Sequence, residues 1–169
     1  MSSKSNQPDE EVKGKIMSRG KLFNSIDIVT VKLVREKDVI YGPKTITSPE
    51  ELASVVKTFL ADTDREVFLT VNFSKANTIN GIHIVSIGSL DRAIVHPREV
   101  FKAAILSNAS SIALVHNHPS GRLIPSQEDI DITRKLVQCG EILSIKVIDH
   151  IIVSEDQHLS FAEQKIGGL

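Results

Sequence analysis

Apolar positions along this chain change their spacing repeatedly, which divides it into strand-like and helix-like segments. Runs rich in β-branched residues predict strands, because such side chains fit a pleated, half-buried surface. Apolar residues three and four positions apart predict helices with one buried face. The expected strands are residues 26–34, 39–41, 66–73, 81–87 and 111–115, with one or two more in 145–153. The expected helices are residues 48–61, 97–106 and 126–139.

Residues that favour helix ends mark the limits of these helices. Ser48 is expected to cap the first helix, with Pro49 at its first position. Gly140 is expected to stop the third helix just after Cys139. Helical spacing predicts the core-facing residues: Leu52, Val55, Val56 and Phe59 in the first helix; Val100, Ala104 and Ile105 in the second; Ile130, Thr133, Leu136 and Val137 in the third.

The order of these segments indicates the fold class. Strands alternate with helices, which predicts an α/β protein with a mixed central β-sheet flanked by helices. A chain of 169 residues is long enough for one domain with a sizeable core. Residues 1–20 are polar and without a period, so we expect a flexible tail there and a single domain over residues 21–169.

Composition excludes several classes of protein. Hydrophobic residues make up 41% and charged residues 24%, as in ordinary globular proteins, and the formal net charge of −1 gives no electrostatic reason to expect nucleic-acid binding. The single cysteine, Cys139, excludes an intramolecular disulfide and a CxxC metal site, and is expected to be a small buried hydrophobe. No signal peptide or membrane-spanning run is visible, so we expect a cytoplasmic protein without a membrane partner.

The candidate chemistry lies in one stretch, residues 116–129. His116 and His118 follow an apolar strand, and side chains at i and i+2 point to the same face, so both imidazoles can aim at one place just past the strand end. Ser126 then begins a helix, and Asp129 falls in its first turn. Two imidazoles and one carboxylate suit Zn²⁺, and three protein ligands leave the fourth tetrahedral position open.

The spacing within this stretch resembles a known motif. His116-x-His118, seven residues, Ser126, two residues and Asp129 match the H-x-H-x7-S-x2-D pattern of the JAMM (JAB/MPN) metalloproteases. This resemblance implies a JAB/MPN, cytidine-deaminase-like architecture with zinc held by the two histidines and Asp129. It also implies hydrolysis of a peptide or isopeptide bond by water that the metal activates, so the expected partner is a peptide or protein substrate.

Further segments resemble the RadC branch of that family. They are residues 116–121 with Pro125 and Ser126, residues 95–100 upstream and residues 149–153 downstream. The similarity covers roughly residues 47–153. Longer RadC-type proteins carry an N-terminal helix-hairpin-helix module associated with DNA; no such module is expected here, because residues 26–41 are predicted to be strands.

The resemblance also assigns two catalytic roles. The family glutamate that acts as general acid/base matches Glu66, at the start of the strand after the first helix. The family serine that supports the oxyanion matches Ser126, although a serine here also suits a helix N-cap. Glu99, at the start of the second helix, is the rival base, while an acid in such a first turn is also structurally expected.

Two other functions stay open beside the zinc hydrolase. The first is a non-catalytic zinc-containing binding module, and the second is a DNA-repair accessory protein, which rests on the RadC label alone. A zinc nucleobase deaminase is excluded because the H-x-E and P-C-x-x-C elements are missing. The oligomeric state is not predicted.

The remaining histidines, His83, His96, His150 and His158, are expected on the surface or as satisfied core residues. Asp149-His150 favours a structural turn, with support of a metal ligand as the alternative.

Overall fold

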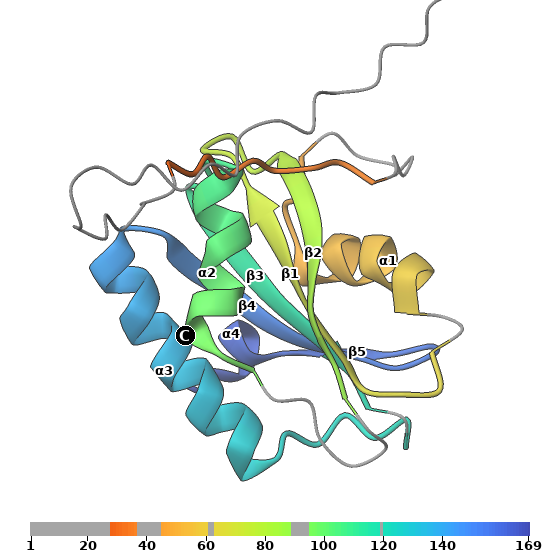
Figure 1. The fold of residues 1–169 in the computed structure, drawn as a ribbon. Helices are drawn as coiled ribbons and strands as arrows, with labels where there is room; N and C mark the ends of the chain where they lie inside the picture. Colours follow the sequence, from red (N-terminus) through yellow and green to blue (C-terminus); the bar gives the residue numbers. More distant parts are fainter. Residues whose placement is uncertain (1–27, 37–44, 61–62, 89–94, 119) are drawn as a thin grey trace, which may run out of the picture. The chain divides into compact units, whose positions relative to one another are not determined.

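The computed structural model describes residues 28–36, 45–60, 63–88, 95–118 and 120–169 (Figure 1). By its internal contacts the chain divides into two units, Met1–Val31 and Lys32–Leu169. Of the first unit, the structure describes residues 28–31, which have no regular secondary structure. The helices and strands given below all belong to the second unit.

The strand expected at residues 26–34 is wrong over its described part, because residues 28–36 form neither strand nor helix. β-branched side chains favour an extended backbone, but a strand also needs a neighbouring strand to complete its hydrogen bonds. Among the described strands none pairs with this segment, and Ile28, Val29 and Val34 are exposed. The strand expected at 39–41 and the tail expected at 1–20 lie outside the described residues, and the domain limits stay a prediction.

The centre of the second unit is a five-stranded sheet with the order β2-β1-β3-β4-β5. The strands are β1 Val67–Phe73, β2 Ile79–Ile87, β3 Ser111–Asn117, β4 Lys146–Val153 and β5 His158–Ser160. Strands β3 and β4 are parallel, whereas the other neighbouring pairs are antiparallel. The sheet is therefore mixed, as the sequence predicts, and the expected strand over residues 145–153 is a single one.

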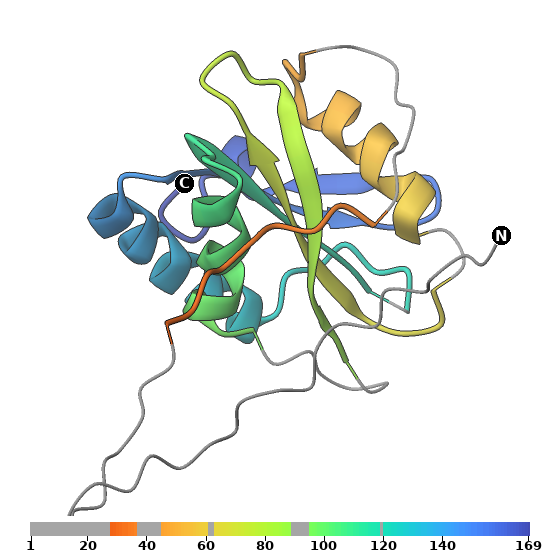
Figure 2. The same cartoon turned by 45° about the horizontal axis from the view of Figure 1, so that its top comes forward.

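Helices cover both faces of this sheet. They are α1 Pro49–Leu60, α2 Pro97–Leu106, α3 Gln127–Leu143 and the short α4 Phe161–Gln164. One core cluster joins α1 to alternate residues of β1, and a second joins α2 and α3 to the opposite face. Figures 1 and 2 show α1 on one side of the sheet and α2 with α3 on the other. The predicted α/β class with flanking helices is confirmed.

The helix caps explain where two of these helices begin. Ser48 Oγ accepts a hydrogen bond from the Glu51 backbone N–H at the start of α1 (3.3 Å). Ser126 caps α3 in the same way and forms a capping box with Asp129. Both predicted N-caps are confirmed. In the described part of the chain, no helix is long and apolar enough to span a membrane.

Two details of the helices differ from the prediction. Ile105 is 53% exposed, because it lies about 100° further round α2 than the buried Ala104, past the edge of the packed face. Helix α3 does not stop at Gly140; it continues to Leu143 and ends at Ser144 in the left-handed conformation (φ 56°). Gly140 is required by close packing instead, since a Cβ there would lie 2.5 Å from the backbone oxygen of Ile145.

Candidate metal centre

The histidine pair and Asp129 meet where β3 ends and α3 begins. His116 is part of β3 and His118 follows that strand directly, so both side chains leave the same face. The Nε2 atoms of the two imidazoles are 2.9 Å apart. The Asp129 carboxylate lies 3.4 Å from Nε2 of His116 and 3.6 Å from Nε2 of His118. These three residues, predicted as ligands from their spacing, form a group that could hold a metal ion.

The capping box holds the Asp129 carboxylate in place. Its Oδ2 accepts hydrogen bonds from the Ser126 backbone N–H (2.8 Å) and from Ser126 Oγ (2.6 Å). In return, Ser126 Oγ accepts from the Asp129 N–H (3.1 Å). Burial alone would raise the pKa of Asp129, but the neighbouring imidazoles of His118 and His116 and the hydrogen bonds from Ser126 hold that pKa well below its usual range. Asp129 is thus a fixed carboxylate, as a cation ligand must be.

The imidazole of His116 is fully buried. Burial lowers its pKa to about 4, with a smaller opposing effect of the Asp129 charge. At neutral pH it is therefore the neutral imidazole, which is the form that binds metals. Its Nδ1 lies 2.8 Å from His150, so the ring presents Nε2 to His118 and Asp129.

His118 presents the same ring atom. Its Nδ1 donates to the backbone oxygen of Arg122 (2.7 Å), because a carbonyl can only accept. The neighbouring Asp129 carboxylate raises the pKa of His118. Two ring nitrogens and a carboxylate direct lone pairs at one another at these distances. A proton or a cation between them is needed to remove the repulsion between these lone pairs. Imidazole and carboxylate are ligands of Zn²⁺, so the donor set fits this ion.

Glu66 lies directly before β1, next to this group. In the antiparallel pairing of β1 with β3, Phe68 is opposite His116, so continuing the register puts Glu66 opposite His118. Figure 1 shows the start of β1, the end of β3 and the start of α3 at the same end of the sheet. Partial burial and the negative charge of Asp129 raise the pKa of Glu66, while His118 opposes this. A raised carboxyl pKa suits a group that must accept and return a proton.

Asn117, between the two histidines, fixes the backbone on both sides of Glu66. Its Oδ1 accepts from the Val67 N–H (2.8 Å), and its Nδ2 donates to the backbone oxygen of Arg65 (3.0 Å) and to Thr63 Oγ1 (3.2 Å). These two backbone groups belong to the peptides that flank Glu66. Asn117 is not among the site residues predicted from the sequence, where its only signal is a polar residue at the end of a buried strand.

The rival base, Glu99, has different neighbours. It pairs with Lys102 and with Arg98 (3.6 Å) on α2, and the hydrogen bond of Lys102 lowers its pKa. None of the groups that affect this pKa belongs to the His116, His118 and Asp129 group. The electrostatic neighbourhood therefore favours Glu66 over Glu99 as the carboxylate next to the candidate centre.

The structural turn favoured for Asp149-His150 is wrong, because both residues lie within β4 and both are buried. Parallel pairing of β4 with β3 places the His150 imidazole against His116. The other three histidines lie elsewhere: His96 is exposed, while His83 and His158 are half-buried, with Lys102 and Glu99 near His83 and Glu50 beside His158.

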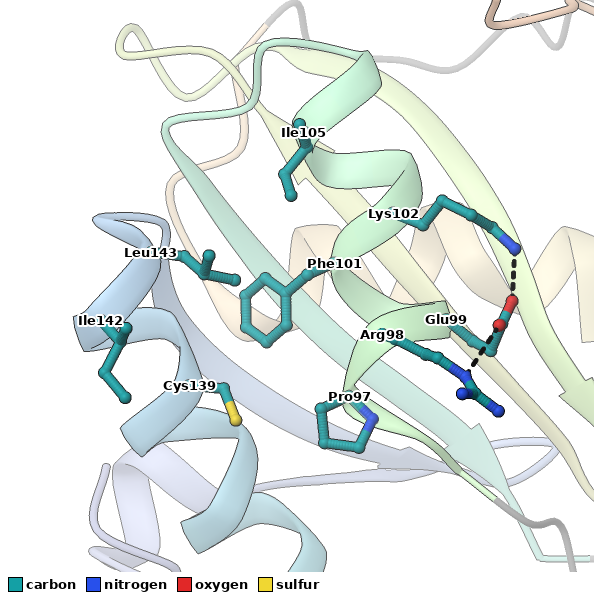
Figure 3. A pocket seen from close by; sticks show the side chains of 9 residues that line it. All are labelled: Pro97, Arg98, Glu99, Phe101, Lys102, Ile105, Cys139, Ile142 and Leu143. Atoms are coloured by element: carbon teal, nitrogen blue, oxygen red, sulfur yellow. Dashed lines mark hydrogen bonds and ion pairs between the residues drawn. The ribbon is translucent and has the colours of Figure 1, made fainter. Parts of the chain in front are cut away.

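A separate pocket of about 620 Å³ lies between α2 and α3 (Figure 3). Phe101 and Ile105 line it from α2, and Cys139, Ile142 and Leu143 from α3. Cys139 is only partly buried there, although it packs against the core cluster of that face. A helix rises about 1.5 Å per residue, so Cys139 is about 15 Å along α3 from Asp129. This pocket is therefore distinct from the candidate metal centre.

Comparison with known proteins agrees with this geometry. Residues 46–166 match the model of a family described as "RadC-like JAB domain". Proteins called "UPF0758 protein" are 46% identical in Desulfitobacterium hafniense, over 72% of this chain, and 38% identical in Clostridium beijerinckii, over 92% of this chain. The matches cover 53% and 69% of those proteins, so the chain spans about half the length of the first of them. The chain belongs to the RadC-like JAB domain family.

Proposed function

We propose that this domain hydrolyses peptide or isopeptide bonds with a Zn²⁺ ion held by His116, His118 and Asp129. The observation that supports this most is the convergence of three metal-binding side chains beside Glu66, a carboxylate whose pKa is raised. A zinc ion bound by three protein ligands supplies an activated water and a Lewis acid for the substrate carbonyl. The substrate partner in this proposal is a peptide or protein.

Glu66 moves the proton in the proposed reaction. Its carboxylate takes one proton from the attacking water while the water oxygen bonds to the carbonyl carbon. When the carbon–nitrogen bond breaks, Glu66 gives that proton to the leaving amine nitrogen. The products are a carboxylic acid and an amine, and Glu66 returns to its starting state. Asn117 contributes by fixing the two peptide groups that flank Glu66.

Ser126 would support the oxygen of the carbonyl as it gains negative charge. Its hydroxyl now donates to Asp129 Oδ2 and accepts from the Asp129 N–H. The proposed role therefore requires the Ser126 proton to turn from Asp129 to the substrate oxygen. Capping and oxyanion support use different parts of the same hydroxyl group, so one does not exclude the other.

The test compares Glu66→Gln with Glu99→Gln in the zinc-loaded protein, on a pool of peptides and isopeptide-linked peptides. The measurement is the release of new amines. Glu66→Gln should keep zinc but lose about 10²–10⁴-fold in rate, because general acid/base help is removed. Glu99→Gln, the matched control, should keep the wild-type rate. Zinc-loaded wild-type protein that cleaves nothing in the pool would favour a non-catalytic module, and an active Glu66→Gln variant would refute the assigned base.

A further inference from the structure

His150 is completely enclosed although its side chain is polar. It is 0% exposed and packs against two aromatic rings: its ring centroid is 5.5 Å from that of Phe68 and 4.6 Å from that of Phe161. Its two ring nitrogens contact His116 Nδ1 (2.8 Å) and Thr133 Oγ1 (2.6 Å). A buried imidazole with both nitrogens in hydrogen bonds has one fixed orientation.

The donors and acceptors in these hydrogen bonds can be assigned by starting from the backbone oxygen of Asp129, where the series ends. Thr133 Oγ1 lies 2.6 Å from the backbone oxygen of Asp129, which can only accept, so the single hydroxyl proton of Thr133 points there. Thr133 must then accept from His150, which places the proton of the neutral His150 ring on Nδ1. His150 Nε2 carries a lone pair, and His116 Nδ1 donates to it.

These hydrogen bonds determine which ring nitrogen of the candidate ligand His116 carries its proton. With its one proton on Nδ1, the neutral His116 ring has a lone pair on Nε2, the atom that faces His118 and Asp129. We infer that Thr133 and His150 are positioning residues, which set the tautomer of His116 so that Nε2 is free to bind the metal. This inference rests on the proposed function, because it assigns a purpose to the same metal group.

The neighbours of His150 hold it in this role. The Asp149 carboxylate accepts from the His150 backbone N–H (2.7 Å), the Ala162 N–H (3.0 Å) and Ser160 Oγ (2.6 Å). These contacts tie β4 to the start of α4, whose Phe161 packs against the His150 ring. Because the chain of hydrogen bonds ends on the Asp129 carbonyl, it also links the ligand from β3 to the ligand from α3.

Control of the His116 tautomer by Thr133 and His150 should have a measurable effect on metal affinity. If Thr133 cannot accept, the His150 proton can move to Nε2, and His116 must then carry its own proton on Nε2, where the metal would bind. Loss of a group that orients a metal-binding histidine weakens metal affinity about 10–100-fold. Valine has nearly the shape of threonine but no hydroxyl, so Thr133→Val removes this acceptor with little change in volume.

The experiment measures the zinc dissociation constant by competition with a chromogenic chelator. Thr133→Val and His150→Leu should raise it about 10-fold or more, while Thr133→Ser and His150→Gln, which keep an acceptor, should stay close to wild type. The wild-type protein without zinc gives a second readout: ¹⁵N–¹H correlations of the imidazoles should show the proton on Nδ1 of both His116 and His150.

The outcomes separate the inference from the proposed function. Unchanged zinc affinity in Thr133→Val, or a proton on Nε2 of His150 in the wild-type protein, overturns the inference while leaving the metal site intact. Wild-type protein that binds no zinc overturns the proposed function itself. Because the imidazole spectrum needs no substitution, it decides the tautomer even where a variant fails to fold.

Discussion

Replacing Asn117 by Ala should weaken both the fold and catalysis. The change removes three hydrogen bonds and leaves the N–H of Val67, a residue that is 3% exposed, without its acceptor. An unsatisfied buried group costs about 1–3 kcal/mol, and each lost bond to a more exposed partner about 0.5–1.5 kcal/mol. Together we expect a loss of about 2–6 kcal/mol in the free energy of unfolding.

The catalytic effect should be separable from the loss of stability. Asn117 bonds the peptide groups on both sides of Glu66, so its loss lets this carboxylate shift, and a displacement of about 1 Å can reduce the rate about 10²-fold. The side-chain hydrogen bonds of Asn117 go to Thr63, Arg65 and Val67 and not to the candidate metal ligands, so zinc affinity should change little. The assays are urea unfolding, zinc titration and hydrolysis, each at a temperature where the variant is folded.

Asn80→Ala is the matched control. Its Nδ2 donates one hydrogen bond, to the Ser107 backbone oxygen (3.2 Å), so we expect a loss of about 0.5–1.5 kcal/mol and an unchanged rate. If Asn117→Ala destabilises no more than Asn80→Ala, the bonds around Glu66 are not the source of stability. If Asn117→Ala keeps full activity, Asn117 does not position Glu66.

Two further predictions concern stability. Because burial and the Asp129 charge raise the pKa of Glu66, ionising Glu66 opposes folding, so stability should fall as the pH rises from the ordinary value of 4.5 through the raised one. The zinc-free Glu66→Gln variant should therefore melt at a higher temperature than wild type at neutral pH and lose this advantage below 4.5; equal melting temperatures at neutral pH would contradict the assigned environment. Gly140→Ala should lower the free energy of unfolding by about 1–3 kcal/mol, since its Cβ would lie 2.5 Å from the Ile145 oxygen. Gly81→Ala, the control, has open space for its Cβ and should unfold at a urea concentration closer to that of the wild type. Similar urea midpoints for the two variants would show that close packing at Gly140 does not matter for stability.

The candidate ligands could be predicted from the sequence because their positions depend on local geometry. His116 and His118 share a face by the period of a strand, and Asp129 is fixed by the cap that begins a helix. Only the final approach of β3 to α3 needed tertiary structure. The α/β class was predictable for a similar reason, since hydrophobic spacing within each segment reports helix or strand.

The residues around the ligands could not be predicted in this way. His150 meets His116 because β4 pairs in parallel with β3, and Asn117 meets Glu66 because β1 pairs with β3; neither pairing leaves a mark in the local spacing. The β-branched run at 28–34 shows the reverse failure, since its composition favours a strand but no described strand pairs with it. Gly140 was misread because close packing and helix termination both select glycine.

The proposed function depends first on metal binding by His116, His118 and Asp129. The most direct measurement is elemental analysis of the protein purified without chelators, beside His118→Ala prepared in the same way. We predict about one zinc per wild-type chain, as three converging ligands and an open fourth position imply, and a large loss of zinc in His118→Ala. Wild-type protein without metal, or a His118→Ala variant that retains stoichiometric zinc, would show that these three residues do not form a metal site.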